Sequence, residues 1–222
     1  MRGLIVSAGK NTRFGADKAL QKIKGVENIV RLHDLMKPHV SDVYISIREE
    51  RLPAYKKILP QANYILLDKS EGCGQAIRDS FKQLPEDFYV ITWGDSIYRD
   101  MDFLSQSFDQ NRFNVFVRAE ADTYVGYEIN DNDDIVKVRF YKDEPTQPSW
   151  CWRDKFTFLG QKSLLQPYLE RLTPDKFGEH HLLFVVDEMY KDGVPAKAIK
   201  ITDTGMFSFN TREDLDAILK QL

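Results

Sequence analysis

The chain has 222 residues, 42% of them hydrophobic, and a net charge of −3. This length supports one α/β domain with a sizeable core, and the slightly negative charge argues against a general nucleic-acid-binding protein. No apolar run is long enough for a signal peptide or reaches the ~20 residues of a membrane span, so we expect a cytoplasmic protein that contacts no membrane.

Short apolar runs alternate with helical patterns through the first half of the chain. Strands are expected at residues 4–6, 42–47, 64–67 and 88–92, and helices that stop just before prolines at 28–37, 52–59 and 75–84. This alternation predicts a doubly wound, mostly parallel sheet in a three-layer α/β fold. Ligands of such sheets bind at the carboxyl ends of the strands, where residues 7–11 and 94–95 fall.

The second half is richer in strands. Strands are expected at residues 114–117, 125–130, 135–140 and 196–201, and helices at 163–171, at 179–191 and from Thr211 onward. The sequence contains no linker and no repeat. We therefore expect a single domain, 1–222, in which residues 1–112 bind a nucleotide and residues 113–222, with a small β insertion, bind an acceptor.

A basic, glycine-containing loop follows the first strand. Residues 4–20 read LIVSAGKNTRFGADKAL, with Lys10, Arg13 and Lys18 spaced around two glycines. Residues 1–24 carry six basic side chains and one acidic side chain. Glycines let a backbone approach an anion and turn its N–H groups toward it, and basic side chains neutralise that anion. The loop therefore predicts a polyphosphate pocket, and the expected ligand is a nucleoside triphosphate.

The loop over residues 9–20, GKNTRFGADKAL, resembles the nucleotidyltransferases. It is similar to the molybdenum-cofactor guanylyltransferase-like branch, whose loop reads roughly G-K-S-x-R-M-G-x-D-K-A-L, and to the sugar-phosphate nucleotidyltransferases, with G-x-G-T-R and later P-K-x-L. Asn11 stands where the sugar enzymes have glycine, and asparagine tolerates the left-handed backbone that the turn needs. Asp17 matches the guanylyltransferase-like form. The resemblance covers both ends and the middle of the chain and is strongest over residues 4–25.

This resemblance implies a Rossmann-like fold of the nucleotide-diphospho-sugar transferase (GT-A) type. It also implies transfer of a nucleoside monophosphate from a triphosphate to a small phosphorylated acceptor, with release of pyrophosphate. Arg13, on the β- and γ-phosphates, and Lys18, on the α-phosphate, would be the catalytic residues. The nucleotide-binding residues that it implies in the loop are Ser7, Ala8, Gly9, Lys10, Asn11 and Thr12.

A second match lies at residues 71–77, EGCGQAI, which open a predicted helix. In the family, a Gly-Thr-Ala-like turn in this position lies against the base and the sugar of the nucleotide. The resemblance implies that Gly72 and Gly74 allow close approach of the nucleotide and that Gln75 hydrogen-bonds the base. Two glycines at a helix start are also common in ordinary turns.

Residues 90–95, VITWGD, end in an aspartate like the family's metal ligand. Both reactants are anions, so a divalent cation is needed to screen their repulsion, and Mg²⁺ prefers oxygen ligands such as Asp95. The second metal ligand normally opens the closing motif D-I-x-T-P-E-D-L, and here that position is Ser208. Asn210 or Asp203 are the possible substitutes. Because a serine hydroxyl is a weak ligand, a nucleotide-binding protein without catalysis is kept as an alternative.

The acceptor side resembles the sugar enzymes more loosely. Gly126 stands where their acceptor pocket has a glycine, and residues 143–145 lack the lysine of their E-K-P-like turn. Trp150 and Trp152 are compatible with an aromatic box for a choline-like cation, although packing is the usual role of such side chains. We expect a sugar phosphate as acceptor, with choline phosphate and molybdopterin as the other options, and we prefer CTP as donor.

Three further patterns are given an ordinary structural role. Asp100 and Asp102 have the D-x-D form found in glycosyltransferases, and a glycosyltransferase of similar fold is the remaining alternative function. The two aspartates are nevertheless expected at a helix start. Adjacent His180 and His181 point apart on a helix and are expected as a surface pair. The two cysteines fit no zinc spacing and are expected to be reduced thiols. The sequence leaves the oligomeric state open.

Overall fold

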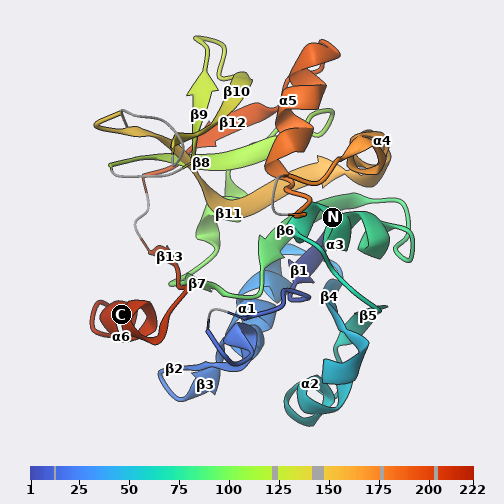
Figure 1. The fold of residues 1–222 in the computed structure, drawn as a ribbon, viewed down its shortest axis with the longest axis vertical. Coiled ribbons are helices and arrows are strands. Elements are labelled where there is room, and N and C mark those ends of the chain that lie inside the picture. The colour runs from blue at the N-terminus through green and yellow to red at the C-terminus, as the bar shows by residue number, and fades with distance from the viewer. Residues whose placement is uncertain (13, 122–124, 142–147, 176–177, 203–204) are drawn as a thin grey trace.

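The computed structural model describes residues 1–222 except 13, 122–124, 142–147, 176–177 and 203–204 (Figure 1). The largest sheet in this part of the chain has nine strands in the order β10-β9-β11-β6-β1-β4-β5, with β8 paired to β11 and β12 paired to β8. None of the described helices is both long and apolar enough to span a bilayer.

The first half of the chain forms the parallel part of the sheet, as predicted. The strands are β1 (Arg2–Val6), β4 (Val43–Arg48), β5 (Asn63–Leu67) and β6 (Phe88–Trp93), and the helices are α1 (Asn28–Met36), α2 (Leu52–Ile58) and α3 (Cys73–Phe81). Neighbouring residues of β1 face opposite sides: Leu4 packs in the core with α3, and Ile5 packs in the core with α1. Because helices cover both faces, consecutive residues of β1, β4 and β6 are buried instead of alternating between buried and exposed.

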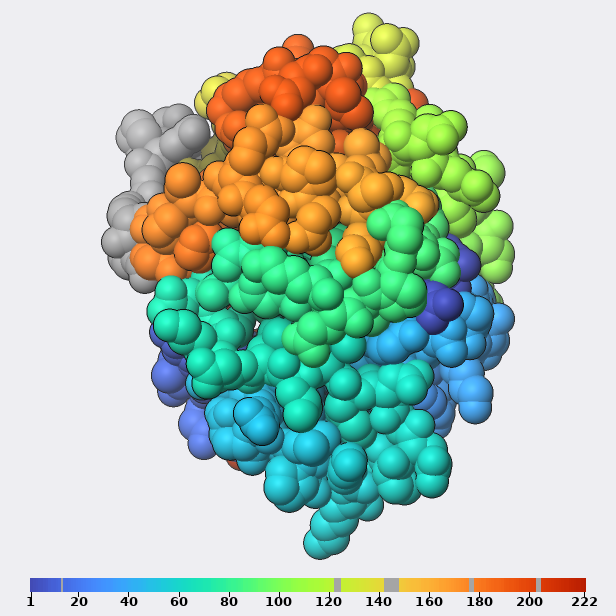
Figure 2. Space-filling model, turned by 90° about the vertical axis from the view of Figure 1, so that its right-hand side faces the viewer, coloured from blue at the N-terminus to red at the C-terminus, as the bar shows by residue number. Residues whose placement is uncertain are grey.

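The second half adds the antiparallel part. It contains β8 (Asn114–Glu120), β9 (Val125–Ile129), β10 (Ile135–Phe140), β11 (Cys151–Gln161) and β12 (Lys197–Lys200), with α4 (Lys162–Arg171) and α5 (Leu183–Lys191). On the face seen in Figure 2, α3, α4 and α5 form one continuous layer. Strand β11 pairs antiparallel with β6, so one sheet runs through both halves. That the halves serve nucleotide and acceptor separately stays a prediction.

Two of these elements differ from the sequence prediction. Residues 151–161 are not among the predicted strands, yet β11 pairs with β6, β8 and β9. Helix α5 begins at Leu183 instead of residue 179. The backbone of His180 hydrogen-bonds the turn before α3 and is not part of the helix. Its N–H donates to the Glu71 carbonyl at 2.8 Å, and its carbonyl accepts from the Gly74 N–H at 2.7 Å.

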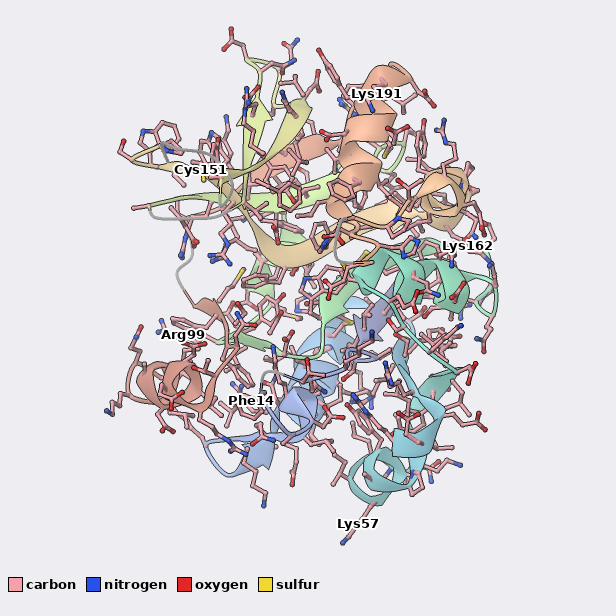
Figure 3. All side chains as sticks on the ribbon, viewed as in Figure 1. Phe14, Lys57, Arg99, Cys151, Lys162 and Lys191 are labelled. Atoms are coloured by element: carbon pink, nitrogen blue, oxygen red, sulfur yellow. The ribbon has the colours of Figure 1, made fainter. Side chains whose placement is uncertain are left out.

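Smaller elements connect and close the domain. β2 (Lys22–Ile23) pairs with β3 (Val26–Glu27), and β7 (Ser96–Tyr98) pairs with β13 (Met206–Ser208). Short 3-10 turns lie at Lys18–Leu20, Lys37–His39, Glu49–Arg51 and Asp102–Ser105. Helix α6 (Arg212–Leu219) begins after Thr211, as predicted, and its capping box joins Thr211 to Asp214. Phe14, labelled in Figure 3, packs edge-to-face against Phe209 beside this helix.

Candidate active site

A cavity of about 340 Å³ lies at the carboxyl ends of β1 and β6. The loop after β1, the turn before α3, Asp95 after β6 and the segment before α5 all contribute to its lining. Of the predicted site residues, those that line it are Gly9, Lys10, Asn11, Thr12, Lys18, Gly72 and Asp95. The structure therefore brings together three motifs that are separate in the sequence, at the sheet edge where a ligand is expected.

The loop after β1 has the turn that the sequence predicts. Asn11 has a φ of 55°, in the left-handed region that favours glycine and that asparagine also tolerates, as the sequence predicts for this position. The Gly15 N–H donates to the Asn11 carbonyl at 3.0 Å and closes the turn. Ser7 and Ala8 are buried beneath the loop. Arg13 lies outside the described residues, so its contact with phosphates stays a prediction.

Two arginines that the sequence analysis did not single out hold this loop from behind. Arg48 Nε donates to the Ala8 carbonyl at 3.1 Å, and Arg51 Nη2 donates to the Gly9 carbonyl at 2.8 Å. In a planar trans peptide the C=O and the next N–H point in opposite directions. The N–H groups of Gly9 and Lys10 are therefore directed away from the arginines, and both residues line the cavity. This orientation is what a phosphate cradle requires.

A buried network ties the far end of the loop to the same arginine. Asp17 Oδ2 lies 3.2 Å from Arg51 Nη1 and accepts from the Tyr55 hydroxyl at 3.1 Å. The Tyr55 oxygen also lies 2.7 Å from Ser7 Oγ. Burial raises the pKa of Asp17, and the charge of Arg51 opposes that rise. Both ends of the loop are thereby fixed to the segment that leads into α2, and Lys18 follows directly on Asp17.

We expect Arg51→Ala to weaken triphosphate binding by ~10-fold, because a charged donor to a loop carbonyl is lost. Binding of the nucleoside monophosphate should change less, since the β- and γ-phosphates depend most on the loop. Isothermal titration calorimetry with the tri- and monophosphate measures both. Arg51→Lys should recover part of the affinity. Arg171→Ala is the matched control, because the Arg171 side chain is 47% exposed at the end of α4. Equal losses for both nucleotides would mean that Arg51 does not act through the phosphate loop.

Lys18 and Asp95 meet in the lining of the cavity. Lys18 Nζ lies 2.8 Å from Asp95 Oδ2, 2.9 Å from the Phe209 carbonyl oxygen and 3.3 Å from Asn210 Oδ1. The two predicted functional residues, 77 positions apart, are thus in direct contact. Three oxygens converge on one cationic group, and oxygen donors of this kind are those that a divalent ion prefers.

The turn that carries Asp95 is held by buried polar contacts. Fully buried Asn28 donates from Nδ2 to the Gly94 carbonyl at 3.0 Å and to the Ser96 carbonyl at 2.8 Å. A Cβ at Gly94 would lie 2.6 Å from Ser7 Oγ, so only glycine fits here against the first loop. Asp95 is therefore fixed relative to the loop after β1.

The predicted second metal position lies beside Asp95. Ser208 on β13 is opposite Ser96 on β7. Ser208, Asn210 and Asp95 line a chamber of about 210 Å³ that adjoins the cavity and shares Asp95 with it. The described residues contain no group of three or more histidine, cysteine or acidic ligands. One carboxylate with neutral oxygens fits a Mg²⁺ site whose remaining ligands are phosphate oxygens and waters. Asp203 lies outside the described residues.

The turn before α3 has glycines for a reason that the sequence did not indicate. Gly72 has a φ of 102°, and a Cβ there would lie 2.5 Å from His180 N. A Cβ at Gly74 would lie 2.6 Å from Leu172 Cδ1. The close approach that requires glycine is therefore to the segment before α5. Gln75 Oε1 accepts from the Glu71 N–H at 2.7 Å, and neither Gly74 nor Gln75 is among the described lining residues. Their contact with a nucleotide stays a prediction.

The residues predicted for the acceptor are not brought to the site. A Cβ at Gly126 would lie 2.7 Å from Sγ of Cys151, which Figure 3 labels near the outer end of β11, so this glycine serves packing. Trp150 and Trp152 pack edge-to-face, and Lys200 Nζ lies 5.1 Å from the Trp152 ring. None of the three lines the cavity or the chamber in the described part of the chain.

Other sequence patterns also fall outside the site. Asp100 and Asp102 lie at the start of the 3-10 turn Asp102–Ser105, as expected, and Asp100 Oδ1 accepts from the Asp102 N–H at 3.2 Å. Neither residue lines the cavity or the chamber as described. Residues 143–145 lie outside the described part of the chain. His181 differs from the expected surface role, since it lines both the cavity and the chamber.

Comparisons with known proteins give partial sequence matches. The bifunctional protein GlmU of Methanococcus maripaludis is 30% identical over 107 residues, which are 45% of this chain and 26% of that protein. The 2-C-methyl-D-erythritol 4-phosphate cytidylyltransferase of Dictyoglomus thermophilum is 39% identical over 59 residues, 25% of each chain. This chain therefore matches about a quarter of the length of these curated relatives.

Solved structures match over nearly the whole chain. A Bacillus anthracis protein described as a glucose-1-phosphate thymidylyltransferase has a TM-score of 0.79 at 18% identity, over 100% of this chain and 94% of its own. The inositol-1-phosphate CTP transferase from T. maritima has a TM-score of 0.76 at 15% identity. This match covers 99% of this chain and 95% of the T. maritima chain. These two matches confirm the Rossmann-like nucleotidyltransferase fold.

The family model described as the MobA-like NTP transferase domain matches residues 3–186, from β1 into α5. Because that match covers most of the chain and includes the phosphate loop and Asp95, the protein belongs to the MobA-like NTP transferase family.

Proposed function

We propose that the protein is a nucleotidyltransferase that moves a nucleoside monophosphate from a triphosphate to a small phosphorylated acceptor. An acceptor phosphate oxygen forms a bond to the α-phosphorus, the bond from the α-phosphorus to the bridging oxygen breaks, and pyrophosphate leaves. The observation that carries this proposal is the contact of Lys18 with Asp95, between the phosphate loop and the adjoining chamber. No general base is needed, because the attacking phosphate is already an anion.

Each residue has a role that follows from its position. The N–H groups of Gly9 and Lys10, with Arg13, would hold the β- and γ-phosphates. Lys18 would contact the α-phosphate, where negative charge has to be stabilised as the transition state forms. Asp95, Ser208 and Asn210 would hold a divalent cation, which when bound screens the repulsion between the two anionic reactants. We take this cation to be Mg²⁺.

The donor and the acceptor are proposed with support from relatives. Two of them are named as a cytidylyltransferase and a CTP transferase, which supports CTP as donor. The acceptors named for these two proteins and for the thymidylyltransferase are phosphorylated sugars or polyols. They are methylerythritol 4-phosphate, inositol 1-phosphate and glucose 1-phosphate. We therefore propose a sugar phosphate or a similar polyol phosphate as acceptor, and a cytoplasmic role in the synthesis of surface-polysaccharide precursors.

A thermal-shift screen of CTP, GTP, UTP, dTTP and ATP, each with Mg²⁺, tests the nucleotide site. We expect one nucleotide to raise the melting temperature most, since a ligand at ~100 times its dissociation constant adds about 2.7 kcal/mol of stability. Pyrophosphate release with that nucleotide and a panel of acceptors then tests catalysis. Binding without pyrophosphate release from any acceptor would leave a nucleotide-binding protein that does not catalyse transfer.

A further inference from the structure

Strand β11 is distorted where it passes the candidate site. Its pairing with β8 shifts register between Asp154, opposite Val117, and Phe158, opposite Val115. Within this bulge Phe156 has a φ of 61°, a conformation that is costly for a bulky aromatic residue. Bulges and strained residues of this kind concentrate next to functional sites, where they change the direction of side chains.

The bulge carries two adjacent buried charges of opposite sign, which have different surroundings. Lys155, 2% exposed, places Nζ 2.6 Å from Glu120 Oε1. Asp154, 8% exposed, lines the chamber beside Asp95. The ammonium of Lys155 therefore hydrogen-bonds Glu120, which leaves the Asp154 carboxylate to face the chamber.

The Asp154 carboxylate has few and long hydrogen bonds. Oδ1 accepts from the Phe156 N–H at 3.2 Å, and Oδ2 accepts from the buried Tyr127 hydroxyl at 3.4 Å. An ionised carboxylate offers about four acceptor positions, and buried polar groups are normally well paired. Asp154 therefore has capacity to accept further hydrogen bonds from a molecule in the chamber.

The chamber connects Asp154 to the reacting centre. It shares Cys73, Trp93, Asp95 and His181 with the nucleotide cavity. Asp154 and Arg153 come from β11, and Ser208 comes from β13. A molecule that fills the chamber would have one end at Asp95 and would present its other groups to Asp154.

We propose that Asp154 selects the acceptor by accepting hydrogen bonds from the hydroxyl groups of a phosphorylated polyol; this inference rests on the proposed function. Arg153 lines the same chamber, so a cationic side chain already lies beside Asp154 there and a cationic acceptor is not needed to balance its charge. Trp93, Phe156 and Phe158 supply apolar surface in the same chamber, which suits the C–H groups of a polyol.

Kinetics of Asp154→Asn and Asp154→Ala test this role. The assay measures pyrophosphate release with the nucleotide from the thermal-shift screen and with glucose 1-phosphate, inositol 1-phosphate or phosphoethanolamine. We expect at least one polyol phosphate to be used by the wild type, and its KM to rise ~10- to 100-fold in Asp154→Ala and less in Asp154→Asn. The KM for the nucleotide should stay within about twofold, because Asp154 would contact only the acceptor.

The control variant is Asp216→Asn, which removes an exposed carboxylate from α6. Melting temperatures verify that each variant is folded, and Asp154→Asn, which keeps the side-chain volume, remains informative if the alanine variant unfolds. An unchanged acceptor KM in both folded variants, or a preference for phosphoethanolamine over both polyol phosphates, would overturn the inference. A wild type that binds nucleotide but uses no polyol phosphate overturns it as well. A wild type that binds no nucleotide instead overturns the proposed function.

Discussion

Replacing Lys18 by alanine is expected to lower kcat by ~10²–10³, because one fixed cationic donor is lost where charge accumulates in the transition state. Lys18 Nζ is held by three oxygens in the lining of the cavity, so its position is defined before any substrate binds. Pyrophosphate release under saturating nucleotide and acceptor measures the effect. The melting temperature should change little, since Asp95 keeps 32% of its side-chain surface exposed and water can replace the ammonium.

Two further variants show whether the charge or the packing of Lys18 matters. Lys18→Met keeps an unbranched apolar side chain of similar length and should be as inactive as the alanine variant. Lys22→Ala removes a lysine from the same region, 64% exposed and paired with Glu27, and should retain wild-type turnover. Wild-type-like turnover in folded Lys18→Ala would refute the assignment of this chain as a nucleotidyltransferase that uses Lys18.

The parts of the site that could be predicted have local sequence signals. The loop after β1 combines a short apolar strand, small residues and spaced basic residues within one stretch, and Asn11 takes the expected left-handed turn. Asp95 follows an apolar strand directly. The carboxyl ends of parallel strands lie at one edge of a sheet, so these two motifs could be expected to meet even though 77 positions separate Lys18 from Asp95.

The site residues that the sequence analysis did not identify contact partners far away in the chain, or lie in a strand without a recognisable hydrophobic pattern. Arg51 holds the Gly9 carbonyl from 42 positions away, and nothing in its own neighbourhood marks that contact. Strand β11 lies between β6 and β8, and its inner residues 156–159 are buried without alternation. A fully buried strand gives no period-2 signal, and a bulge hides the pattern further. Asp154 therefore had no recognisable context in the sequence.

Gly72 and Gly126, two glycines singled out by the resemblance, are required for packing within the protein. Gly72 and Gly126 are both sites where a Cβ would clash, so glycine is structurally required at each. The groups that a Cβ would meet are the His180 backbone and the Cys151 side chain, and the approach of a nucleotide to Gly72 stays a prediction. A glycine in a sequence motif indicates that another group lies close to its backbone, and the structure is needed to identify that group.

Replacing Asp95 by asparagine is expected to remove the dependence of nucleotide binding on Mg²⁺. The amide keeps the volume and one oxygen near Lys18, but it loses the negative charge, and Ser208 and Asn210 offer only neutral oxygens. Comparing the nucleotide-induced thermal shift in Mg²⁺ and in EDTA measures the effect. The wild type should show a larger shift with Mg²⁺, and the variant should show the same shift in both, with kcat lower by ~10²-fold or more.

Two further variants, Asp102→Asn and Ser208→Ala, test whether the loss of the Mg²⁺ response is specific to Asp95. Asp102→Asn changes an exposed aspartate that lines neither the cavity nor the chamber as described, and it should keep the wild-type response to Mg²⁺. Ser208→Ala should weaken the response less than Asp95→Asn, because it removes a neutral ligand. If Asp95→Asn kept the full difference between Mg²⁺ and EDTA, the cation would have to be held elsewhere. The contact between Lys18 and Asp95 would then only position the lysine, because the carboxylate could orient Nζ toward the α-phosphate without binding a metal.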